Sequence, residues 1–322
     1  AGQPGWLAGL PIGIKVLSAV SGVRTTMGTL GLKDNIPTQN DPIVDILEGS
    51  GGLVVGKTNT PEMGAGGNTT NKVFGSTRNP WNTKKNAGGS SGGAAASLAS
   101  GEVWLSQGSD LAGSLRTPAA YCGVVGFRPS PGRVFGGPMM LGFSVEGLSG
   151  PMARSVADCA LFLDAMAGYD DRAPLGLHAP AKPFQSAVER INPAVRIAYA
   201  PTLGGFAPVE GEIEQIMRSA LQLMEVEGAR VDEACPSMQG LYETYITLRA
   251  MTWACLPGRA PRSIQKHYKK TLAENIELGR TLSTDQIYDA NLSRTEIYHR
   301  MRIFLKDHDV LACAVVGLEP LD

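Results

Sequence analysis

The amino-acid sequence predicts an α/β protein with a mixed, largely parallel central sheet that is covered by helices on both faces. Short apolar runs alternate with helical segments through the first half of the chain, which is the pattern of parallel strands linked by helices. A hydrophobic content of 43% over 322 residues is enough to bury a large core.

The first elements follow from apolar runs and a helix-start signal. We expect a strand at residues 12–16 and a buried strand at 52–55 that delivers Lys57 to its end. Asp41 precedes a predicted helix at 42–49, because aspartate can accept hydrogen bonds from first-turn amides and proline fits the first helical position.

The later elements follow from the same patterns. Small residues predict a helix at 94–99, and a strand is expected at 103–105. Ser155 and Asp158 have the spacing of a capping box ahead of an apolar helix at 159–166. Farther along, the sequence predicts strands at 196–199 and 310–316 and helices at 209–226, 241–254, 263–278 and 284–305.

The composition argues against several classes of function. A formal net charge of −1 provides no general attraction to phosphate backbones, so nucleic acid is not an expected partner. No apolar stretch reaches the length of about 18 residues that a transmembrane helix needs, so no membrane partner is expected. No secretory signal is visible in the sequence, which begins with Ala1, and we expect a cytoplasmic protein.

The cysteines and histidines argue against thiol and metal chemistry. The five cysteines are scattered and form no CxxC pair, which predicts reduced thiols. All four histidines lie from His178 onward, outside the segment that is rich in motifs. These positions disfavour both a Ser-His-Asp triad and a zinc site.

Two glycine-rich segments that carry serines are the most informative feature of the sequence. GGSSGGAAA at 88–96 contains Ser90 and Ser91, and GSDLAGSLRTP at 108–118 contains Ser114. Glycine permits backbone conformations in which several N–H groups converge on one point. Such amides stabilise an oxyanion, and a serine beside them can act as a nucleophile. The two segments therefore predict a covalent hydrolase that uses a second serine.

These segments resemble the amidase signature family, in particular its stand-alone amidases. LPIGIK at 10–15 is similar to the strand that carries the family's catalytic lysine. The resemblance covers roughly residues 8–175 and implies the amidase signature fold. Further matching motifs follow in the family's order: GKTNTPEMG at 56–64, VFGSTRNPWN at 73–82, CGVVGFRPSPGRV at 122–134 and GPMARSVADCA at 150–160.

The resemblance implies a catalytic triad of Lys15, Ser90 and Ser114. Ser114 would attack the amide carbonyl, Ser90, preceded by a cis peptide, would relay the proton, and Lys15 would be the base. A serine hydroxyl needs a base within reach, and burial of Lys15 in an apolar strand would lower its pKa. The expected reaction is hydrolysis of a carboxylic amide to an acid and ammonia or an amine through an acyl-enzyme, with no metal or organic cofactor.

The backbone amides of the turn that carries the nucleophile are the expected oxyanion hole: Leu111, Ala112, Gly113 and Ser114. Two positions depart from the family's pattern. Ala112 stands where glycine is usual, which predicts strain if this residue needs a positive φ. Val16 stands where the family usually has a polar residue.

Other polar residues near the serines have predicted supporting roles. Ser91 is expected to be a supporting hydrogen-bond group, with a plain N-cap of the following helix as the alternative. Asp110 and Arg116 flank the turn and are expected to pair across it, with solvated surface charges as the alternative. Lys57 also ends a strand, but the resemblance places the base upstream, so we expect a structural role for it.

The substrate pocket is predicted from the resemblance and from apolar residues near the GPMA motif. The glycine-rich loop at 62–68 is expected to line the acyl pocket, and apolar residues ahead of GPMA are expected at its entrance. The candidate pocket residues are Met63, Gly64 and Ala65 in the loop, with Met139 and Phe143 at the entrance.

The sequence predicts a core at 1–175 that carries the triad, followed at 176–322 by a helical and strand remainder of the same domain. The resemblance implies that a further quarter to third of an ordinary family member would follow, and the sequence does not say whether this chain ends early or is part of a longer protein.

A small-molecule amide is the expected partner, and a homodimer is left open. Two alternatives also stay open: the amidase subunit of a tRNA-dependent amidotransferase, which works with partner subunits, and a catalytically inactive binding protein of the same fold.

Overall fold

Two compact units make up the chain in the computed structural model. The first unit contains Ala1–Arg190, Pro261–Lys269 and Pro320–Asp322, and the second contains Ile191–Ala260 and Lys270–Glu319. The structure describes residues 2–135, 141–190 and 192–322.

The first unit is built around a five-stranded sheet with the strand order β2-β1-β7-β9-β8. β1 pairs in parallel with β2 and β7, while β9 runs antiparallel to β7 and β8. The predicted mixed sheet is therefore confirmed. Its strands are β1 (Pro11–Lys15), β2 (Leu53–Thr58), β7 (Leu105–Asp110), β8 (Val125–Gly126) and β9 (Leu148–Ala153).

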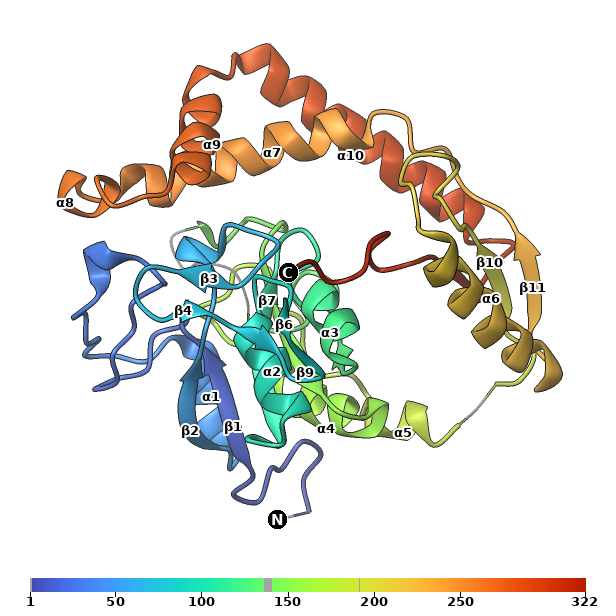
Figure 1. The fold of residues 1–322 in the computed structure, drawn as a ribbon. Helices are drawn as coiled ribbons and strands as arrows, with labels where there is room; N and C mark the ends of the chain where they lie inside the picture. Colours follow the sequence, from blue (N-terminus) through green and yellow to red (C-terminus); the bar gives the residue numbers. More distant parts are fainter. Residues whose placement is uncertain (1, 136–140, 191) are drawn as a thin grey trace. The chain divides into compact units, whose positions relative to one another are not determined.

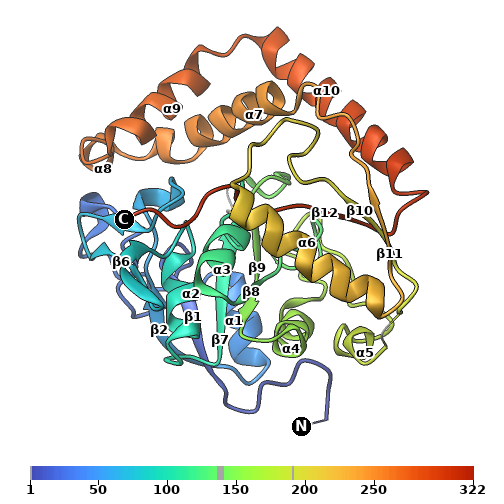
Figure 2. The ribbon, with the colours of Figure 1, turned by 45° about the vertical axis from the view of Figure 1, so that its right-hand side comes forward.

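Helices cover both faces of this sheet (Figure 2), and each face has its own apolar cluster. One cluster joins Ile12 and Ile14 of β1 to Phe162, and the other joins Met152 of β9 to Leu98. Alternate residues of a strand point to opposite faces, so Gly13 and Lys15 lie on the face away from Ile14. The covering helices are α1 (Pro42–Gly49) and α4 (Val156–Met166) on the first face, and α2 (Gly92–Ala99) and α3 (Arg116–Cys122) on the second.

Short elements complete the first unit. β3 pairs with β4, and β5 pairs with β6, in two small antiparallel ribbons. These elements are β3 (Thr70–Asn71), β4 (Gly75–Ser76), β5 (Arg78–Asn79), β6 (Asn82–Asn86), α5 (Gln185–Val188), α8 (Arg262–Gln265) and the 3-10 turns Leu30–Leu32 and Glu62–Gly64.

The second unit contains a three-stranded parallel sheet with the order β11-β10-β12. α6 lies beside β10 and β11, and α7 packs along α9 and α10 (Figure 1). Its elements are β10 (Arg196–Tyr199), α6 (Gly211–Val226), β11 (Arg230–Glu233), α7 (Leu241–Cys255), the 3-10 turn Pro257–Arg259, α9 (Lys270–Thr281), α10 (Thr284–Phe304) and β12 (Val310–Ala312).

Several local predictions are confirmed, but the prediction that the Asp41 side chain caps a helix is wrong. The helix at 42–49 is present, and the Ser155 hydroxyl caps α4 by accepting a hydrogen bond from the Asp158 amide. Asp41 does not cap its helix with its side chain, because its carboxylate accepts the Ala19 amide at 2.8 Å instead. Asp41 therefore ties the start of α1 to the segment that follows β1.

Two predicted elements differ in extent. The strand expected at 103–105 begins at Leu105 and continues through polar residues to Asp110, because hydrogen bonds to β1 and β9 hold it on both sides. The helix expected at 263–278 divides into α8 and α9, and between them the Lys269 amide donates to the Glu62 carboxylate at 2.6 Å rather than to a helical carbonyl. β9 and β11 are not among the predicted strands. Every helix in the described ranges is too short or too polar to cross a bilayer.

Phe162 is expected to be a major contributor to the stability of the first unit. Its side chain is fully buried in the cluster between β1, α1 and α4. Replacement by alanine removes a whole ring from a packed core, so Phe162→Ala should lower the free energy of unfolding by about 3–5 kcal/mol. Urea unfolding followed by circular dichroism measures this loss, and a loss below about 1 kcal/mol would contradict the packing described.

Candidate active site

Lys15 is the buried cation of the first unit and lies at the carboxyl end of β1. The alternation along β1 directs Ile14 into the cluster under α1 and α4, and it directs Lys15 to the opposite face, where the segment before α2 begins. The predicted base is therefore delivered to the predicted serine segment by the register of one strand.

Three serine hydroxyls surround the Lys15 ammonium. Nζ lies 2.7 Å from Ser90 Oγ, 2.8 Å from Ser91 Oγ and 3.0 Å from Ser109 Oγ. Ser90 and Ser91 are buried, and the peptide between Gly89 and Ser90 is cis, as the resemblance implies. The Ser91 hydroxyl makes no capping bond to α2, so its contact with Lys15 is the hydrogen bond predicted for a supporting group.

Burial lowers the pKa of Lys15 from its ordinary value of 10.5 to about 7, although the nearby Asp110 carboxylate opposes the change. Desolvation disfavours the charged ammonium, whereas a negative charge favours it. The lowered pKa makes the neutral amine, which a general base requires, accessible at neutral pH.

Lys57 lies away from the serines. In the parallel pairing of β1 and β2, Lys57 is the register partner of Ile14 and Thr58 is the partner of Lys15. Paired residues share a face of the sheet, so Lys57 lies on the face opposite to Lys15. Its Nζ donates to the Ser18 carbonyl. Burial lowers its pKa to about 8, with the Asp41 carboxylate opposing the change.

The turn that carries Ser114 joins β7 to α3. The Ser114 carbonyl accepts the Ser91 amide at 3.1 Å, which holds the two predicted serine segments together. Gly113 has φ +100°, a conformation that favours glycine. Ser114 is half-buried, which is compatible with the role predicted for it.

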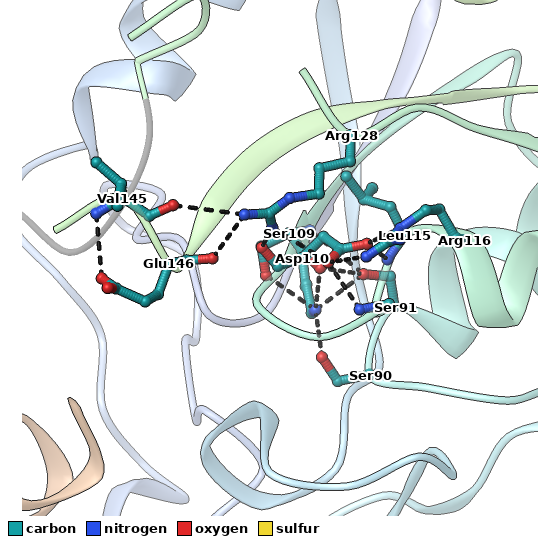
Figure 3. Close-up of polar contacts among 11 residues, drawn as sticks. Ser90, Ser91, Ser109, Asp110, Leu115, Arg116, Arg128, Val145 and Glu146 are labelled. Carbon is teal, nitrogen blue, oxygen red and sulfur yellow. Dashed lines mark hydrogen bonds and ion pairs between the residues drawn. The ribbon is translucent and has the colours of Figure 1, made fainter. Parts of the chain in front are cut away.

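A buried carboxylate, that of Asp110, organises this turn (Figure 3). Its oxygens accept the amides of Gly113 at 2.8 Å and Leu115 at 3.1 Å. The Arg116 guanidinium binds both oxygens, through Nε at 3.0 Å and Nη2 at 3.1 Å, so the predicted pair across the turn is present. Burial alone would raise the pKa of Asp110, but Arg116 and the two amides lower it to about 2.

The Gly113 amide already donates its hydrogen bond to the Asp110 carboxylate, so it is not available to bind an oxyanion. This contact removes one of the four predicted oxyanion-hole donors. Among the described residues, the amides of Leu111, Ala112 and Ser114 have no such partner. These three are the remaining donor candidates, and the carboxylate of Asp110 fixes the turn from which they project.

Strain at Ala112, expected if this residue had a positive φ, is not found. The left-handed residue of the turn is Gly113, and Ala112 is not among the non-glycine residues with positive φ in the described ranges. Ala112 is also exposed. Alanine therefore fits this position without a backbone penalty.

Ala112→Gly should consequently leave amide turnover unchanged within about twofold, since removal of an exposed methyl changes mainly the freedom of the unfolded chain. Turnover numbers on one small and one bulky amide check this expectation. A several-fold gain on the small amide would mean that the methyl hinders acyl transfer.

The predicted pocket loop lies against Ser90. A Cβ added to Gly64 would stand 3.7 Å from Ser90 Oγ, so a side chain there would approach the Ser90 hydroxyl. Met63 adopts φ 54° within the turn, and its amide donates to the Met27 carbonyl at 2.7 Å. The Ala65 carbonyl accepts the Lys269 ammonium. Phe143 is strongly exposed, and Met139 lies outside the described residues.

Sequence reasoning missed three residues that hold this site, Ser109, Arg128 and Lys269, and it missed the contact of Lys269 with Glu62 of the predicted pocket loop. Ser109 contacts Lys15, Arg128 contacts Asp110, and Glu62 and Lys269 bind each other across the pocket loop. The serine before Asp110 in the second motif was a usable signal for Ser109, since both lie on β7. Arg128 and Lys269 depend on contacts between segments that the sequence does not place together.

A comparison of the whole chain with known proteins decides the family. A family model described as Amidase matches residues 1–322. The chain belongs to the amidase family. An acylamidase of Rhodococcus erythropolis is 38% identical to this chain over 312 residues, which are 95% of this chain and 65% of that protein. A putative amidase of Synechocystis sp. is 34% identical over 315 residues, which are 97% and 60% of the two proteins.

A solved structure supports the same conclusion for the fold. A bacterial aryl acylamidase of the amidase signature family superposes with a TM-score of 0.89 at 31% identity, covering 99% of this chain and 68% of that one. A glutamyl-tRNA(Gln) amidotransferase subunit of Synechococcus sp. is 38% identical over 243 residues, or 75% of this chain and 50% of that protein. The chain thus spans about half to two thirds of the length of these curated relatives.

Proposed function

We propose that this protein hydrolyses a carboxylic amide through an acyl-enzyme on Ser114. The buried Lys15 amine beside the Ser90 hydroxyl, 2.7 Å away, is the observation that carries the proposal. A lysine with a pKa near 7 can act as a base at neutral pH. Membership of the amidase family and the likeness to acylamidases support the same reaction.

The proposed acylation moves one proton along the serines. Ser114 Oγ bonds to the carbonyl carbon, its proton passes to Ser90, and the Ser90 proton passes to the neutral Lys15 amine. The amides of the Ser114 turn hold the resulting oxyanion. When the tetrahedral species collapses, the C–N bond breaks and the leaving nitrogen takes a proton back through Ser90.

Deacylation uses the same groups in the same order. The oxygen of a water molecule attacks the acyl ester carbon, the water proton passes to Ser90, and the Ser90 proton passes to the neutral Lys15 amine. The bond to Ser114 Oγ then breaks, Ser114 recovers a proton, and the acid leaves. No step requires a metal or an organic cofactor.

We propose that the substrate is an N-acylated amine, whose amide bond joins an acyl group to the nitrogen of the amine. The support is the likeness to an acylamidase and to an aryl acylamidase, both matched over at least 95% of this chain. A panel of acylated anilides, simple aliphatic amides and glutamine tests the proposal, with released amine or ammonia as the readout. Turnover of an anilide supports it, and inertness toward the whole panel contradicts it.

The role of an amidotransferase subunit is the competing function, since one such protein from Synechococcus sp. is 38% identical to this chain. Ammonia release from glutamine that occurs only with partner subunits present would favour it over the stand-alone amidase. The cytoplasmic location and the small-molecule partner of the enzyme are parts of the proposal. The five cysteines, all of them in the described ranges, form no disulfide in the structure, which agrees with a reducing compartment.

A further inference from the structure

Arg128 joins three segments of the first unit at one guanidinium (Figure 3). It follows β8, and its Nη1 donates to the Asp110 carbonyl and, at 3.2 Å, to Asp110 Oδ1. Its Nη2 donates to the carbonyls of Glu146 at 2.9 Å and Val145 at 3.4 Å, just before β9. The end of β7, the segment after β8 and the start of β9 therefore meet at this side chain.

The Asp110 carboxylate connects Arg128 to the Ser114 turn through hydrogen bonds. The same Oδ1 atom that accepts Arg128 also accepts the Gly113 amide at 2.8 Å, and Oδ2 accepts the Leu115 amide at 3.1 Å. These two amides flank Ser114 in the sequence. The position of the Asp110 carboxylate therefore fixes the backbone on both sides of the nucleophile.

We propose that Arg128 is a positioning residue for catalysis: it holds Asp110, and through Asp110 it holds the Ser114 hydroxyl and the neighbouring oxyanion-binding amides in their reactive places. This inference rests on the proposed amidase function. Arg128 touches no reacting atom, so it acts through Asp110.

Arg116 binds the same carboxylate but cannot replace Arg128. Arg116 belongs to the turn that Asp110 organises, so it moves with that turn, whereas Arg128 connects the turn to the segment that leads into β9. The Arg116 side chain is also 47% exposed, compared with 24% for Arg128. Exclusion of water strengthens hydrogen bonds, so the less exposed contacts of Arg128 add an anchor to the segment before β9 that the two bonds of Arg116 do not supply.

Arg128 also affects the electrostatic potential at the Lys15 side chain. Asp110 is the charged group whose field favours the Lys15 ammonium, and the other groups at Nζ are the neutral serines. Removal of the Arg128 cation leaves the negative charge of Asp110 less compensated. The Lys15 ammonium then gains stability, its pKa rises, and the rising limb of activity moves to higher pH.

The test compares Arg128→Met and Arg128→Lys with Arg133→Met. Arg133 is a matched control, because it contacts the His178 carbonyl rather than Asp110. Arg128→Met should lower kcat on the best amide by about 100-fold with KM changed less than threefold, as expected when reacting groups are displaced. Arg128→Lys should lose about tenfold, because an ammonium cannot reproduce the fork of the guanidinium. Arg133→Met should lose less than twofold.

Two further readouts separate positioning from a general loss of structure. The rising limb of kcat/KM should move upward by about 0.5 pH unit or more in Arg128→Met and stay in place in Arg133→Met. A crystal structure of Arg128→Met should show that the bond between the Gly113 amide and Asp110 is broken or displaced. If Arg128→Met does not fold, the kinetic and crystallographic measurements are made on Arg128→Lys, which keeps the positive charge.

Retention of kcat within threefold, or an unmoved pH limb together with an intact bond between Gly113 and Asp110, would overturn the role of Arg128. An unmodified protein that turns over no amide in the same assay would contradict the proposed function instead. In that case the crystal structures still decide whether Arg128 positions the turn.

Discussion

Ser114→Ala is expected to lower amide hydrolysis by about 10⁴-fold or more, because loss of the nucleophile in a triad removes nearly all of the covalent route. The Ser114 turn joins the Ser91 segment through the bond between the Ser91 amide and the Ser114 carbonyl. That bond uses only backbone atoms, so the alanine variant keeps it. The loss should therefore appear in turnover without a loss of folding.

A fluorophosphonate probe provides a second measurement of the same prediction. The probe should label the unmodified protein at Ser114 and should not label Ser114→Ala. Ser97→Ala is a matched control, because the Ser97 hydroxyl is buried and donates to the Ala94 carbonyl within its own helix. Activity above about one per cent in Ser114→Ala, or undiminished labelling, would show that another residue is the nucleophile.

The residues of the proposed triad could be proposed from the sequence because glycine-rich patterns mark the two serine segments and the resemblance to the amidase signature family assigns the roles of Lys15, Ser90 and Ser114. Ser90 and Ser114 lie in glycine-rich turns, where the residue types themselves indicate the backbone conformation. Lys15 lies in an apolar strand whose period of two places successive side chains on opposite faces. The structure brings Lys15 and Ser90 to 2.7 Å, although they are 75 positions apart in the chain.

The residues that hold the site could not be predicted in the same way. Arg128 meets Asp110, which is 18 positions earlier in the chain, because β9 pairs antiparallel with both β7 and β8 and so brings their ends together. Lys269 reaches the pocket loop from a segment about 200 residues away, between two helices that the sequence pattern merges into one. Such contacts depend on tertiary packing, which local propensity does not encode.

Lys15→Ala is expected to lower turnover by about 10³-fold or more, whereas Lys57→Ala should retain it within about threefold, because a general base contributes roughly 10²–10⁴-fold and Lys57 is not in a position to supply it. Lys15 Nζ contacts the Ser90 hydroxyl, while Lys57 lies on the opposite face of the sheet and donates to the Ser18 carbonyl. Lys15 is buried and Lys57 is partly buried, and they lie at the ends of adjacent parallel strands, so each is a close control for the other. Comparable losses in two folded variants would contradict the assignment of the base.

The pH profile distinguishes the two lysines independently of the size of the loss. Only the neutral amine accepts a proton, so activity must rise as pH increases through the pKa of the base and fall away below it. With Lys15 as the base, the rising limb of kcat/KM should lie near its pKa of about 7, and it should persist unchanged in Lys57→Ala. With Lys57 as the base, the limb would lie near about 8 and would disappear in Lys57→Ala.

The negative charge of Asp110 raises the pKa of Lys15. Asp110→Asn removes that charge, so the pKa of Lys15 should fall and the rising limb of kcat/KM should move to lower pH. A limb that moves upward in Asp110→Asn would mean that the titrating group is not this lysine.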